Sequence, residues 1–137
     1  MTLGPNLPDS CLRGITKTDD ITSDGKVAAV AFYPSKKNAP NRPDGASETS
    51  INWEDDGNAL PFSLQQFPNG VIRVLKVELD RIKKAPTSNG EFDYERAPLP
   101  NHLNDYHGNL LFQRDLPQPR IKMISSVIAM FCESVIR

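Results

Sequence analysis

The stretch RDLPQPRIKMISSVIAMFCESVIR, residues 114–137, has the clearest helical pattern in the chain. Asp115 is a suitable N-terminal cap, and Pro117 and Pro119 suit a first turn, where a backbone N–H has no partner within the helix. We therefore expect a helix from about Pro119 to Val135. Its apolar residues form two neighbouring stripes: Ile121, Ile124, Ile128 and Val135, then Met123, Val127, Met130 and Phe131. A helix this apolar packs firmly on a sheet or is shared with a partner.

The segments before this helix have the composition of strands. GVIRVLKVELDRI, residues 70–82, gives the clearest one, and EFDYERA, residues 91–97, alternates apolar and acidic residues. We expect these two strands to pair as a hairpin with a long connection. A short helical turn is expected from Pro61. The other expected strands are VAAVAFY (27–33), TSINW (49–53) and GNLLFQ (108–113).

These elements predict an α+β fold, with a small, mostly antiparallel sheet packed by the C-terminal helix. The length of 137 residues predicts one domain. Twelve prolines and eight glycines indicate long Pro/Gly-rich loops, and 34–47 is the longest of them. We expect residues 1–14 to be a flexible lead-in and residues 15–137 to form the domain.

The charge balance narrows the classes of function. Sixteen basic and 17 acidic residues give a net charge of −1, which argues against broad binding to nucleic acid.

The N-terminus lacks the basic and apolar regions of a signal peptide, and no apolar run is long enough to span a membrane. Cys11 and Cys132 are expected to be reduced thiols in a cytoplasmic protein. The residue pattern predicts no cofactor and no metal site, because the acidic run EDDGN (54–58) is typical of a solvated turn.

Both histidines lie in the stretch APLPNHLNDYHGNLLF, residues 97–112. One interpretation is a small metal-independent hydrolase or nuclease site, since histidine exchanges protons near neutral pH. The residues of that site would be His107, His102, Tyr106 and Asp105. The other interpretation is a turn leading into a strand, because the stretch is rich in Asn, Asp and Gly.

The function that the sequence predicts is a small, non-enzymatic interaction module or an accessory subunit of a larger assembly. The partner is a protein, or a second copy of the chain, bound through the C-terminal helix. The predicted contact residues are Met123, Val127 and Met130, together with Trp53. Methionine adapts to irregular contacts, and tryptophan often anchors interfaces, although Trp53 also fits a core position beneath the Pro-rich loop.

Overall fold

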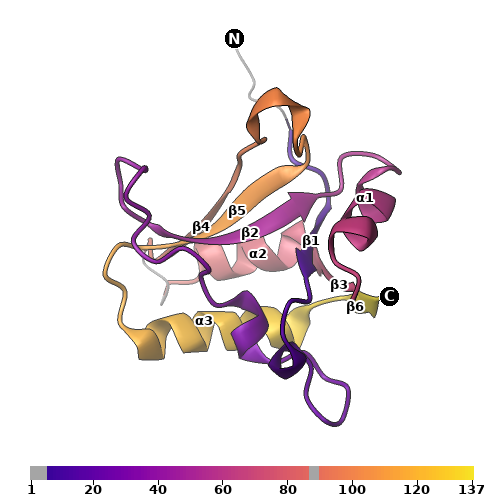
Figure 1. Ribbon diagram of the computed structural model, residues 1–137. Coiled ribbons are helices and arrows are strands. Elements are labelled where there is room, and N and C mark those ends of the chain that lie inside the picture. The colour runs from indigo at the N-terminus through magenta and orange to yellow at the C-terminus, as the bar shows by residue number, and fades with distance from the viewer. Residues whose placement is uncertain (1–5, 87–89) are drawn as a thin grey trace.

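The computed structural model describes residues 6–86 and 90–137, and these form an α+β fold (Figure 1). The described strands make one antiparallel sheet in the order β4-β5-β2-β1-β3-β6, with α3 packed on it. The strands are β1 Ser10–Gly14, β2 Ser47–Trp53, β3 Val71–Leu75, β4 Phe92–Arg96, β5 His107–Phe112 and β6 Ser134–Ile136. The α-helices are α1 Ala59–Gln66, α2 Lys76–Lys84 and α3 Gln118–Phe131. The predicted fold class is therefore confirmed.

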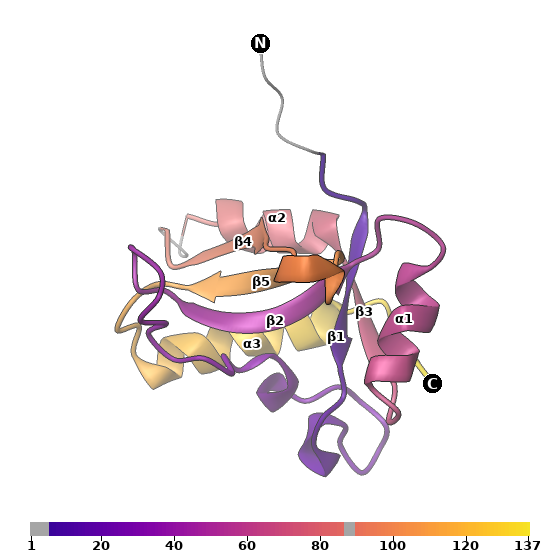
Figure 2. The ribbon, with the colours of Figure 1, turned by 45° about the horizontal axis from the view of Figure 1, so that its top comes forward.

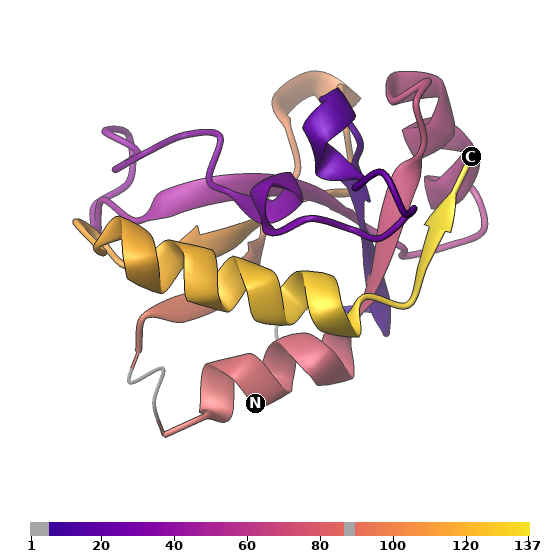
Figure 3. The same cartoon turned by 90° about the horizontal axis from the view of Figure 1, so that it is seen from below.

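Helices cover the two faces of the sheet unequally. Figures 2 and 3 show α2 and α3 side by side across one face, while α1 lies at one end of the other face. Asn52 alternates along β2 with the buried Ile51 and Trp53, and its amide donates to Ser63 Oγ of α1 at 2.8 Å. The main core therefore lies between the sheet and the α2–α3 layer, and α1 is held on the opposite face.

The core is built from alternate strand residues and from the inward stripe of α3. Trp53, Leu110 and Phe112 are fully buried, and the rings of Phe92 and Phe112 pack edge to face. Ile121, Ile124 and Ile128 of α3 are buried against the sheet, as the first stripe predicted. Three 3₁₀ turns complete the fold: Thr18–Asp20, Ala29–Phe32 and Pro100–His102.

The predicted strand over residues 70–82 is wrong beyond Leu75. The chain turns into α2 at Lys76, because Leu79 and Ile82 are buried at helical spacing while Val77 is exposed. Ion pairs with helical spacing support this helix, namely Lys76 with Asp80 and Arg81 with Glu78. The predicted hairpin is also wrong, since β3 pairs with β1 and β6, and β4 pairs with β5.

Three other element predictions need correction. Residues 27–33 do not form a strand, because a continuous apolar run fits a buried helical turn equally well. Ala29–Phe32 is a 3₁₀ turn, and the buried Arg13 donates from Nε to Ala31 O at 2.8 Å.

Residues 10–14 are not a flexible lead-in but the central strand β1, while residues 1–5 lie outside the described chain. The C-terminal helix ends at Phe131, so Val135 belongs to β6.

An ion pair links the end of β2 to β3 and makes stability depend on pH. Arg73 donates to both carboxylate oxygens of Glu54, at 2.6 and 2.8 Å, and Ser10 Oγ donates at 2.8 Å. The Arg73 guanidinium holds the pKa of Glu54 below its ordinary value, and partial burial opposes this only in part. The ionised carboxylate is therefore favoured in the folded state.

We expect Glu54→Gln to lower the free energy of unfolding by about 1–3 kcal/mol at neutral pH, because hydrogen bonds to a charged group are lost. A depressed carboxyl pKa stabilises the fold above the unfolded pKa of about 4.3, and this contribution is lost as pH falls. Urea unfolding at neutral pH and at about pH 3 should therefore show the wild type approaching the variant in acid. Asp19→Asn, at an exposed position, is the charge-matched control. A gap that stayed constant between the two pH values would contradict this role for Glu54.

Candidate functional site

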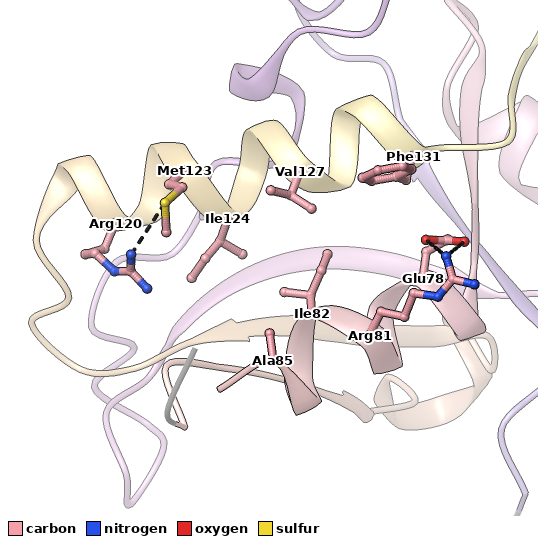
Figure 4. Close-up of a pocket in the computed structure, with 9 residues that line it drawn as sticks. All are labelled: Glu78, Arg81, Ile82, Ala85, Arg120, Met123, Ile124, Val127 and Phe131. Atoms are coloured by element: carbon pink, nitrogen blue, oxygen red, sulfur yellow. Dashed lines mark hydrogen bonds and ion pairs between the residues drawn. The ribbon is translucent and has the colours of Figure 1, made fainter. Parts of the chain in front are cut away.

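A hollow lies between α2 and α3 on the side away from the sheet (Figure 4). It has a volume of about 280 Å³. One wall is a stripe of α2 and the other is a stripe of α3. The lining residues are Glu78, Arg81, Ile82 and Ala85, then Arg120, Met123, Ile124, Val127 and Phe131. We call this hollow the α2–α3 groove.

Helical periodicity explains why the groove is apolar. Residues 121, 124 and 128 of α3 face the sheet, and residues 123, 127 and 131 are displaced around the helix toward α2. Met123 is 42% exposed and Phe131 is 50% exposed. Ile82 and Ile124 lie buried at the inner edges of the two helices, whereas the apolar outer edge of α3 remains open to solvent.

Charged side chains stand at both ends of the groove. At the Phe131 end, Arg81 Nη1 donates to Glu78 at 3.2 and 3.4 Å, and the Arg81 side chain is 71% exposed. At the other end, Arg120 Nε donates to both oxygens of Glu91, at 3.1 and 3.2 Å. Arg120 Nη1 also contacts Met123 Sδ at 3.5 Å, so the guanidinium borders the apolar lining directly. The groove therefore combines an apolar floor with a cation at each end.

The residues predicted to contact a partner separate into three places. Met123 and Val127 lie together in the groove. Met130 is 73% exposed but lines a different hollow, with Val27 and Ala129. Trp53 has no exposed surface, and its Nε1 donates to Glu95 O at 3.0 Å, so its predicted role as an interface anchor is wrong.

The histidine stretch forms a loop from β4 to β5 and the start of β5. His107 Nδ1 lies 2.8 Å from Ala97 O, and His102 Nδ1 lies 2.9 Å from Asp105 Oδ1. Tyr106 Oη donates to Asp56 Oδ1 at 2.9 Å, and this carboxylate raises the pKa of the phenol. Each side chain has its own local partner. No hydrogen bond joins His107 to His102, Tyr106 or a carboxylate within the described residues, so the geometry lends no support to the hydrolase or nuclease hypothesis.

Residues 6–86 and 90–137 show neither a metal-binding cluster nor a membrane-spanning helix. No cluster of three or more His, Cys, Asp or Glu residues is arranged to hold a metal ion. No helix in these ranges combines the length and apolar character needed to cross a membrane. Cys11 and Cys132 are both free thiols, and burial raises the pKa of each.

The α2 wall of the groove was not predicted, because residues 76–82 were assigned to a strand. The sequence does carry the relevant signal, since Leu75, Leu79 and Ile82 follow an i, i+4, i+7 pattern. That pattern would have predicted a helix that carries both Arg81 and Ile82. The position of α2 next to α3 depends on the tertiary packing and has no local signal.

Comparison with known proteins finds no relative of this chain. The chain matches no family model, no curated protein and no solved structure.

Proposed function

We propose that this chain is a non-enzymatic interaction module that binds a protein partner in the α2–α3 groove. The observation that carries the proposal is the open apolar floor, where Met123 and Phe131 remain substantially exposed beside Val127. Contiguous apolar surface with a polar border is typical of protein interaction sites. Methionine at such a surface adapts to the shape of the partner.

The proposal includes a cytoplasmic location. Its support is the pair of free thiols, because a small secreted domain would normally use disulfides to supplement its core. A partner that covers the exposed face of α3 is consistent with an accessory role in a larger assembly.

Site-specific photocrosslinking tests the proposal. The full chain carries a benzophenone side chain in place of Met123 or, as a matched control on the same helix, in place of Met130. In cells that naturally produce the protein, we expect a defined adduct from position 123 and not from position 130. Mass spectrometry of the adduct identifies the partner, or shows a second copy of the chain.

The purified partner then allows affinity to be measured. Met123→Glu should weaken binding at least about 30-fold, close to 2 kcal/mol, because the new carboxylate loses its water on binding. Met130→Glu makes the same substitution outside the groove and should change affinity less than about twofold. Circular dichroism checks that both variants are folded. Equal sensitivity at both positions, or no effect at either, would overturn the assignment of the groove.

A further inference from the structure

The two helices that form the groove are more basic than the chain as a whole, and Arg81 and Arg120 are the cations that line the groove. The helices α2 and α3 together carry six cationic side chains and two carboxylates, whereas the whole chain has a net charge of −1. The cations are Lys76, Arg81, Lys83, Lys84, Arg120 and Lys122. Glu91 and Asp93 pair with Arg120 and Lys83, and cations still outnumber carboxylates when these two acids are included. This excess favours an anionic partner.

Arg81 is the cation best placed to pair with a bound partner. Its contact with Glu78 is long and spans one helical turn, and the Arg81 side chain is 71% exposed while the Glu78 side chain is 17% exposed. Pairs of this kind contribute little to stability. A carboxylate on a bound partner could pair with the Arg81 guanidinium alongside Glu78, which accepts from Nη1, and burial beside Phe131 would strengthen the new pair.

The dimensions of the groove suit a short helix. Residues 78–84 of α2 cover about 9 Å and residues 120–131 of α3 cover about 16 Å along their axes, at 1.5 Å per residue. Figure 4 shows the stripes running in opposite directions, with Glu78 near Phe131 and Ala85 toward the Arg120 end. Apolar anchors at i, i+3 or i+4, and i+7 of a third helix span about 10 Å, which matches this length.

An extended peptide fits the groove less well. Both walls are helices, whose backbone N–H and C=O groups are already paired along their middle turns. A strand lying between them would lose water from its own backbone groups without gaining hydrogen bonds, which costs free energy. A helical partner pairs its backbone internally and presents only side chains.

A second copy of the chain is disfavoured by charge. A two-fold dimer through the groove would oppose the same basic surface on both subunits. Arg81 and Arg120 of both subunits would then lie in the same interface, and like charges at an interface are repulsive.

We infer that the occupant of the α2–α3 groove is an acidic amphipathic helix. Its apolar residues contact Met123, Val127 and Phe131, and a carboxylate pairs with Arg81. The inference rests on the proposed function, because it specifies the chemistry of the partner for the same groove.

A helical peptide display library tests this inference. Peptides of about 14 residues carry leucine at i, i+4 and i+7, and their other positions vary among Glu, Lys, Gln and Ala. The wild-type chain is the target, and Met123→Glu removes peptides that bind elsewhere. We expect the selected peptides to be enriched in Glu and to become helical on binding.

Exchanging the charges of Arg81 and of the facing peptide residue then tests the ion pair between them. Arg81→Glu should weaken binding of a selected peptide at least about tenfold, the lower range for close charge pairs at interfaces. A peptide with Lys in place of the facing Glu should recover most of that loss with Arg81→Glu. Lys37→Glu makes the same charge change on an exposed loop outside the groove and should alter affinity less than about twofold.

The outcomes separate the inference from the proposed function. Selected peptides that need Met123 but are basic, neutral or insensitive to Arg81→Glu would overturn the acidic helix and leave the groove as the interaction site. A library with no binder dependent on Met123 would count against both. Sedimentation showing a wild-type dimer that Met123→Glu dissociates would identify a second copy as the occupant. Binding to phosphatidylserine vesicles that Met123→Glu abolishes would identify a lipid surface. Either of these last two results would overturn the acidic helix.

Discussion

Replacing Gly108 with alanine is expected to lower the free energy of unfolding by about 3 kcal/mol or more. Gly108 lies inside β5, where a Cβ atom would stand 2.3 Å from Trp53 Nε1 and 2.4 Å from Glu95 O. Trp53 is fully buried and donates from Nε1 to that same oxygen. The new methyl group must displace the indole or separate β4 from β5, so the cost combines overpacking with a lost buried hydrogen bond.

Gly57→Ala is the matched control for this substitution. An added Cβ at Gly57 would meet no atom within 4 Å, and we expect a change within about 0.5 kcal/mol. Urea unfolding followed by far-UV circular dichroism measures these variants and also those that lack Trp53, the only tryptophan of the chain. Trp53→Phe places a smaller ring at the contact, so it should cost less in the Gly108→Ala background than alone. A loss below about 1 kcal/mol for Gly108→Ala would show that the indole is not confined by the β5 backbone.

Two elements with clear local patterns, α3 and β4, were predicted correctly in type and approximate position. The stripe of Ile121, Ile124 and Ile128 placed α3 on a sheet, and the alternation around Phe92 and Tyr94 indicated β4. The errors arise where short apolar runs fit two periodicities, as in residues 70–82. The order of the strands in the sheet could not be predicted from local patterns, because the pairing of β1 with β3 joins segments far apart in the chain.

The candidate site was only partly predictable for the same reason. Met123 and Val127 were identified because they form a second stripe on a long helix. Met130 was grouped with them because it lies on the same predicted stripe, seven residues after Met123, although the hollow it lines is a different one. The composition of residues 97–112, with two histidines close together, suggested the catalytic hypothesis. Its neighbours in space show a structural arrangement instead, centred on Asn104.

Asn104 belongs to a buried polar network that joins three elements. Its Nδ2 donates to Asn52 Oδ1 at 2.8 Å, and its Oδ1 accepts from Tyr106 N at 2.9 Å. Asn52 in turn donates to Ser63 Oγ and to Gln66 Oε1 of α1. Asn52 and Asn104 are both almost fully buried. The loop that contains His102 and leads to His107 of β5, called the histidine loop below, is thus attached to β2 and α1 through side-chain amides.

We expect Asn52→Leu and Asn104→Leu each to lower the free energy of unfolding by about 2–3 kcal/mol, because each leaves the other amide buried without its partner. In the double variant both polar groups are gone, so its loss should be at least about 1 kcal/mol smaller than the sum of the single losses. Asn69→Leu, at an exposed turn, should stay within about 0.5 kcal/mol of the wild type. Chemical unfolding of all four variants measures the cycle. Single losses that simply add would mean that the two amides do not depend on each other, and the histidine loop would then need another anchor.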